Sequence, residues 1–260
     1  MGVILTPLEM TGKIGEFTAY KRKGSDKIIF RRRTGPSKKD ILQAPRFEGT
    51  RMHLSDFGAC NKLTAGIRRA LARIKHLGDP NFTGALNKAA KNIQEMNTED
   101  CRGQRRILLS RHRHMLSGFQ LNSNYPFDGL LRHPLSVHTD RTQASATVVI
   151  PHIQPGIALA LPWQAPFYRM IITLGIVGDI QYHQNGFHPS VTTYPHSIAT
   201  EWRFQAAESE KTELFLQLQE PLPDDASLVL GIGIEMGKPD RHGVIGTARY
   251  TGSAKILEVF

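Results

Sequence analysis

The residues best suited to chemistry in this chain are basic side chains crowded near its start. Nine lysines and arginines fall within nineteen residues: Lys21, Arg22, Lys23, Lys27, Arg31, Arg32, Arg33, Lys38 and Lys39. Such side chains bind phosphate oxygens, and the neighbouring rings of Tyr20 and Phe30 offer surfaces on which bases can stack. The run therefore predicts an interface for nucleic acid or another polyanion.

A predicted helix adds three more cations to this interface. Apolar residues recur at spacings of four, four and three: Leu63, Ile67, Leu71 and Ile74. This periodicity predicts one buried helix face, and Arg68, Arg69 and Arg73 lie on the remaining surface, where we expect them to contact phosphates. The chain contains no recognised sequence-reading motif, such as the aromatic pair of an RNA-recognition fold, so little sequence specificity is expected.

Histidines are the next candidates, since the chain has 11 of them. His183, His188 and His196 lie within 14 residues, and a metal site would need three or four such ligands to converge. No cysteine lies near them in the sequence, so we interpret them as surface or loop residues. No metal and no cofactor are expected, although the spacing leaves metal binding by these three histidines open.

Nucleophilic and phosphate-loop chemistry find little support. The chain has two cysteines, Cys60 and Cys101, and no G-x-S-x-G motif. Cys60 follows Gly58 and Ala59, a setting typical of inert packing. The glycine-rich stretch from Gly231 has Pro239 where a phosphate loop needs Ser or Thr, so its alternating glycines predict close packing instead. We therefore predict no catalytic residue and a non-enzymatic protein.

The net charge of +10 is unevenly distributed. Residues 1–150 hold 26 Lys and Arg against 12 Asp and Glu, a net charge of +14, whereas residues 151–260 hold 7 against 11, a net charge of −4. Such asymmetry suggests a polyanion-binding part joined to a neutral or acidic part. It leaves open that the basic part meets an acidic face of the same chain or of a partner.

Three kinds of segment must position these residues. Two β-prone runs, residues 14–20 and 27–31, bracket a turn and predict a hairpin followed by an irregular basic arm. Helices are expected over 63–77, from an N-cap at Thr83 onward, and over 103–117, where a strand is the alternative. Period-two apolar patterns then predict eight strands: 144–150, 157–161, 167–177, 200–204, 213–218, 228–236, 244–250 and 255–260.

These segments predict an α+β fold in three parts. Residues 1–50 form the basic β-hairpin and arm, residues 51–125 a helical segment, and residues 143–260 an antiparallel β-sandwich that is jelly-roll-like. The charge and composition both change between residues 125 and 145, which predicts a domain boundary there, with the polar stretch 138–143 as a linker. No membrane span and no signal peptide are expected, so we predict a cytoplasmic protein with reduced thiols.

The chain opens with a motif that joins Thr11-Gly12-Lys13-Ile14-Gly15 to Tyr20-Lys21-Arg22-Lys23-Gly24 and then to residues 29–33. Two shorter motifs follow, Phe57-Gly58 and Leu116-Ser117-Gly118-Phe119, ahead of the β-rich tail. Together these stretches resemble a family of uncharacterised bacterial proteins, and the resemblance covers most of the chain. It implies a bacterial protein with this layout, and it implies no activity, cofactor or catalytic residue.

The leading hypothesis is a binding protein for nucleic acid or another polyanion. The alternative is a subunit of an assembly, such as a phage-like, envelope or secretion particle, which docks on an acidic protein surface or forms a homo-oligomer. A third hypothesis is a carbohydrate-binding or hydrolytic β-sandwich in which Trp163 and Trp202 serve as sugar platforms, although tryptophan in a sandwich is more typical of the core.

Overall fold

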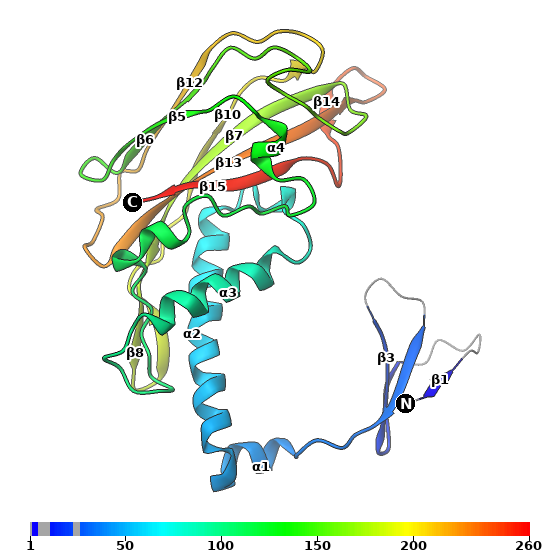
Figure 1. Ribbon diagram of the computed structural model, residues 1–260, viewed down its shortest axis with the longest axis vertical. Helices are drawn as coiled ribbons and strands as arrows, with labels where there is room; N and C mark the ends of the chain where they lie inside the picture. The colour runs from blue at the N-terminus through cyan, green and yellow to red at the C-terminus, as the bar shows by residue number, and fades with distance from the viewer. Residues whose placement is uncertain (1, 5–10, 23–26) are drawn as a thin grey trace. The chain divides into compact units, whose positions relative to one another are not determined.

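The computed structural model describes residues 2–4, 11–22 and 27–260, so Lys23 lies outside the described residues (Figure 1). It divides into two compact units, Met1–Arg51 and Met52–Phe260. Helices and antiparallel sheets are both present, which confirms the α+β class.

The first unit is built on a small antiparallel sheet with the strand order β1-β4-β3-β2. Its strands are β1 (Gly2–Ile4), β2 (Gly12–Ile14), β3 (Phe17–Lys21) and β4 (Ile28–Arg32). The predicted hairpin is confirmed as the β3–β4 pair, in a register that runs from Phe17 opposite Arg32 to Lys21 opposite Ile28.

The predicted irregular arm is only partly irregular. Strand β4 includes Arg31 and Arg32, and helix α1 (Lys38–Gln43) contains Lys38 and Lys39. The helix forms there because Ser37 and Asp40 make a capping box, in which each side chain accepts a hydrogen bond from the other residue's backbone N–H. A 3₁₀ turn, η1 (Pro45–Phe47), leads to helix α2 (Glu48–Ala70), which begins in this unit and continues into the second.

The second unit centres on two long antiparallel strands, β7 (Phe167–Gly178) and β13 (Ala226–Pro239). Four shorter strands complete this six-stranded sheet: β10 (His196–Ala199), β11 (Arg203–Phe204), β14 (Ile245–Thr247) and β15 (Ser253–Val259). A three-stranded sheet contains β5 (Ser136–Asp140), β6 (Ser145–Ile150) and β12 (Thr212–Gln217). Strands β8 (Ile180–His183) and β9 (Gly186–Pro189) form a separate hairpin.

Most predicted strands of this unit are confirmed, and three predictions are wrong. The run 157–161 is a turn in which Leu159 makes only isolated bridges, to Leu131 and Pro155. The stretch 138–143, predicted as a linker, begins inside β5. Residues 103–117 hold two 3₁₀ turns, η3 (Leu109–Arg111) and η4 (Arg113–Met115), because the backbone of Ile107 pairs with Ile180 instead of continuing a helix.

The helices of the second unit begin and end at residues that differ from those predicted. Helix α2 ends at Ala70, and a turn with the 3₁₀ segment η2 (Lys75–Leu77) brings the chain to Gly78, which caps that segment. Helix α3 (Phe82–Glu95) has Asn81 as its N-cap and not Thr83, so Thr83 already lies within the first helical turn. A short helix, α4 (Phe127–Leu130), follows later in the chain.

The long strands are buried on both faces. Tyr168, Met170 and Ile172 share a core with the three-stranded sheet, whereas the intervening Ile171 and the neighbouring Val229 share a core with α2 and α3. Figure 1 shows these helices on one face of β7, β13 and β15 and the three-stranded sheet on the other. The predicted boundary between 125 and 145 therefore lies inside one unit, because helices and sheet share a core. The jelly-roll description of the two sheets stays a prediction.

Helix α2 approaches the sheet most closely at Gly175 of β7. A Cβ built on Gly175 would lie 2.9 Å from the Cα of Ala70, and the Thr173 hydroxyl donates a hydrogen bond of 2.8 Å to the Ala70 carbonyl. On β13, Gly231 and Gly233 receive the side chains of Leu71, Ile74 and Leu77. The predicted close packing at these glycines is thereby confirmed.

We expect Gly175→Ala to destabilise the protein, since the added methyl would press on the backbone of α2. Overpacking of this kind costs about 1–3 kcal/mol, measurable as a lower urea midpoint with an unchanged slope. Gly246→Ala is the matched control, because a Cβ on Gly246 in β14 meets no atom within 4 Å. Equal midpoints for the two variants would show that the helix does not dock at Gly175.

Candidate nucleic-acid interface and buried polar clusters

The structure places eight of the nine predicted basic residues of the run on the surface of the first unit. All eight are exposed: Lys21, Arg22, Lys27, Arg31, Arg32, Arg33, Lys38 and Lys39. Residues 1–51 hold 12 Lys and Arg against 5 Asp and Glu, whereas residues 52–260 hold 21 against 18. The first unit thus has a net charge of +7, and the charge of the second is nearly balanced at +3.

The strand register divides these residues between the two faces of the small sheet. Because side chains alternate along a strand, Lys13, Tyr20 and Arg31 share one face. The Arg31 guanidinium lies over the Tyr20 ring, 5.8 Å from its centroid. This face combines an exposed aromatic ring with two exposed cations, as a surface for stacked bases and phosphates requires.

The opposite face of the sheet is more apolar. Phe17 and Phe30 stack with their ring centroids 4.9 Å apart, so one surface of the Phe30 ring is already covered. Arg32 on this face forms an ion pair of 2.7 Å with Glu16, and both side chains are well exposed. The two aromatic residues that the sequence offered as stacking surfaces, Tyr20 and Phe30, therefore lie on opposite faces.

Lys38 and Lys39 occupy the first turn of α1. Positive charge there opposes the helix macrodipole, which favours anions at the N-terminus and cations at the C-terminus. The capping carboxylate of Asp40 offsets this, and its hydrogen bonds from Ser37 lower the Asp40 pKa below its ordinary value. The two lysines therefore destabilise the first turn of α1, and their charged side chains are exposed.

The three arginines predicted on the helix belong to the second unit and do not share one surface. Arg68 is half-buried, with its guanidinium 5.6 Å from the centroid of the Phe82 ring. Arg69 and Arg73 are exposed, four residues apart, although Arg73 follows the end of α2. Only these two keep the outward position that the periodicity predicted.

The histidines and cysteines show no converging ligand set within the described residues. His183 and His188 face each other across the β8–β9 hairpin with ring centroids 5.9 Å apart, while His196 lies on β10 of the large sheet. Across residues 2–4, 11–22 and 27–260, no group of three His, Cys, Asp or Glu is arranged to hold a metal. Burial raises the pKa of the Cys60 thiol to about 11, so the thiol stays protonated at neutral pH.

A buried charged cluster on the large sheet was not foreseen from the sequence. Glu235 of β13 is 1% exposed and lies opposite Arg169 of β7, whose Nε donates to its carboxylate at 2.6 Å. His76 Nε2 lies 2.8 Å from the other carboxylate oxygen, and the Arg169 guanidinium also stacks on Trp202, 4.3 Å from its ring centroid. Burial raises the Glu235 pKa, but the hydrogen bonds from His76 and Arg169 outweigh it and lower the net pKa.

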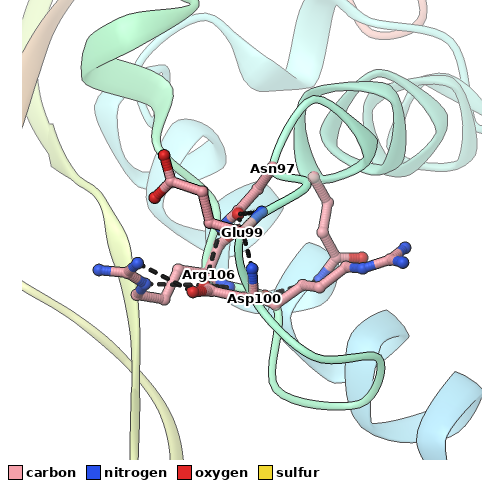
Figure 2. A network of polar contacts seen from close by, with 6 residues as sticks. Asn97, Glu99, Asp100 and Arg106 are labelled. Carbon is pink, nitrogen blue, oxygen red and sulfur yellow. Dashed lines mark hydrogen bonds and ion pairs between the residues drawn. The ribbon is translucent and has the colours of Figure 1, made fainter.

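A second polar network closes the loop after α3 (Figure 2). Arg106 binds both carboxylate oxygens of Asp100, with Nε at 2.7 Å and Nη2 at 2.9 Å. The Asn97 amide donates to the same carboxylate at 2.8 Å, and its oxygen accepts the backbone N–H groups of Glu99 and Asp100. The network fixes the loop whose end, Ile107, pairs with Ile180, so its arginine serves structure and not the polyanion interface.

Loss of Arg169 should destabilise the second unit because it leaves the Glu235 carboxylate buried without its main partner. We expect Arg169→Leu to cost about 3–5 kcal/mol in the free energy of unfolding. The double variant Arg169→Leu/Glu235→Leu should recover most of that loss, since it removes both charges. Urea unfolding of the two variants tests this, and a double variant no more stable than the single one would contradict it.

Asp100 should make stability depend on acid pH. The hydrogen bonds from Arg106 hold the Asp100 pKa at about 2, below its ordinary 3.8, so its contribution is complete above pH 3.8 and is lost as the pH falls toward 2. We expect Asp100→Asn to cost about 1–3 kcal/mol at neutral pH and to flatten this part of the stability profile. Glu220→Gln, which neutralises an exposed carboxylate that has no ion pair with a described residue, is the control that should leave both unchanged.

Comparison with known proteins adds no relative. No protein-family model matches the chain, and no match is found among curated proteins or solved structures. In the part of the chain that the structure describes, no helix is both long and apolar enough to cross a membrane.

Proposed function

We propose that the protein is a non-enzymatic binding protein that engages nucleic acid, or another polyanion, through its first unit. The observation that carries this proposal is the concentration of positive charge: residues 1–51 account for +7 of the net +10, and eight of the described Lys and Arg side chains between Lys21 and Lys39 are exposed. Lys and Arg in such density raise the local concentration of polyanions and release counterions on binding.

The carboxylates of this unit support the proposal because two of those described are already engaged. Glu16 pairs with Arg32, and the Asp40 carboxylate accepts hydrogen bonds from the backbone N–H and the hydroxyl of Ser37. Arg22, Arg33, Lys38 and Lys39 are exposed without an ion pair to any described residue. Their positive charge is therefore available to phosphates.

The face with Lys13, Tyr20 and Arg31 is the proposed contact surface for single strands. A base stacked on Tyr20 would place its neighbouring phosphates near two cations, with no hydrogen bond to a base edge required. The proposal therefore predicts binding with little dependence on sequence. Arg69 and Arg73 of the second unit are proposed as additional phosphate contacts, and Arg68 contributes through its packing on Phe82.

We place the protein in the cytoplasm in this proposal, where Cys60 and Cys101 remain reduced and nucleic acid is accessible. The two packed sheets of the second unit are proposed to be a jelly-roll-like sandwich that docks a partner or a second copy.

A second candidate function is assembly with other copies of the chain. It is favoured by the apolar side chains Ile14 and Phe17, which are 45% and 40% exposed on the same face as Phe30. Burial of that face in a second copy would remove apolar area from water. Light scattering that finds a uniform oligomer free of nucleic acid would support assembly, and a monomer would contradict it.

Binding of a labelled single-stranded oligonucleotide should weaken steeply with salt. Each phosphate contact contributes about −0.7 to the slope of log K against log salt for a single strand. We expect Arg31→Ala/Arg32→Ala/Arg33→Ala to reduce the size of that slope by about 2, because up to three contacts are lost. Fluorescence anisotropy at several salt concentrations measures this slope for the unaltered protein and for the triple variant.

The matched control removes the same charge elsewhere. Lys211→Ala/Lys238→Ala/Arg241→Ala takes three exposed cations from the second unit and should leave the slope unchanged. Equal effects of the two triple variants would show that net charge alone drives binding. Binding that does not change between low and high salt would exclude the phosphate interface.

A further inference from the structure

The second unit contains a pocket of about 310 Å³ beside the segment that joins β14 to β15. Segments far apart in the sequence meet there, contributing His76 and Asp79, Asn124 and Tyr125, and Tyr250. Neither the polyanion interface nor the buried charged cluster accounts for this arrangement of aromatic and polar groups.

Tyr250 is the most unusual residue of the pocket. Its backbone has a φ of 61°, the left-handed conformation that side chains other than glycine seldom adopt, and its side chain is 99% exposed. A strained backbone that presents a large, fully exposed ring gains no packing energy in return. Backbone outliers of this kind cluster at active sites and ligand clamps, which makes this ring a candidate for contact with a ligand.

A second ring lies on the same pocket and is held firmly. Tyr125 is 43% exposed and makes an edge-to-face contact with Trp163, with ring centroids 5.0 Å apart. Its backbone N–H is fixed by the Asn122 side-chain oxygen. Trp163, expected as a sugar platform, thus packs against the Tyr125 ring. Trp202, the other expected sugar platform, has one ring face covered by Arg169.

The polar groups of the pocket favour a neutral ligand rich in hydroxyls. Burial raises the Asp79 pKa, but hydrogen bonds from Ser123 and Asn81 outweigh it, so the carboxylate is ionised and disfavours anions. Asn124 is exposed, and its side chain has no hydrogen bond to another described residue. His76 uses Nε2 for Glu235, which leaves its Nδ1 for another partner.

We propose that this pocket binds a neutral saccharide. The pyranose ring has an apolar face of C–H groups that packs on aromatic rings, here Tyr250 and Tyr125. Its hydroxyls can donate to the Asp79 carboxylate and exchange hydrogen bonds with Asn124 and His76. This site is independent of the first unit, so it stands or falls separately from polyanion binding.

The test titrates the full chain with cellotriose, maltotriose and N,N′,N″-triacetylchitotriose by calorimetry. We expect millimolar binding of at least one of them, and a loss of affinity of about tenfold or more in Tyr250→Gly. The same substitution should raise the unfolding temperature, because glycine relieves the left-handed backbone. Lower affinity together with higher stability cannot arise from misfolding.

Two further variants and one competing ligand complete the experiment. Asn124→Ala should weaken binding, whereas Tyr194→Ala, which removes a tyrosine 82% exposed outside the pocket, should leave it unchanged. Failure of all three sugars to bind overturns the proposal. So does unchanged affinity in Tyr250→Gly, or tighter binding of tetramethylammonium than of any of the sugars, which would identify a cation site.

Discussion

The architecture of the second unit depends on a central sheet that is buried on both faces. Strands β7 and β13 pair over their length, and their side chains enter one core on one face and another core on the opposite face. A strand in this position has no exposed side on which to place polar groups. Each polar side chain that remains must find a partner within the protein, as Thr173 does at Ala70 and Glu235 does at Arg169.

The division into units changes how the charge of the chain is understood. Counted along the sequence, the basic and acidic parts meet near residue 150, but the helices and the β-rich segment fold as one body. Arginines of the middle segment are then compensated locally, as Arg106 is by Asp100, or are used in packing, as Arg68 is on Phe82. Most of the excess positive charge lies in the small first unit.

The periodicity of apolar residues predicted those helices and strands whose conformation follows from their own sequence. Apolar residues recur at every second position of residues 228–236, which lie in β13. Residues 63–70 follow helical spacing in α2, and the β-prone runs 14–20 and 27–31 supply the paired strands β3 and β4. Residues 103–117 could not be predicted in this way, because Ile107 takes its conformation from pairing with Ile180. Charge and composition placed a boundary between residues 125 and 145 for a related reason, since neither reports which segments share a core.

The candidate sites were also only partly predictable from the sequence. The basic residues of the first unit were identifiable from their density, but their division between two sheet faces depends on register, which only the structure supplies. The pocket beside Tyr250 combines residues from distant segments, none of which stands out by itself. No sequence pattern marks Tyr250 as a residue with a left-handed backbone conformation, because the geometry of the turn sets its φ angle and not the types of the adjacent residues.

The pairing of Arg169 with Glu235 also constrains how this protein can change over time. A single substitution at either position passes through a form with an uncompensated charge inside the sheet, so most such variants would be removed before a second change could rescue them. The two positions should therefore vary together among descendants of this chain, and His76 should follow them. An alignment of related sequences would show this contact as covariation between two residues that lie 66 positions apart.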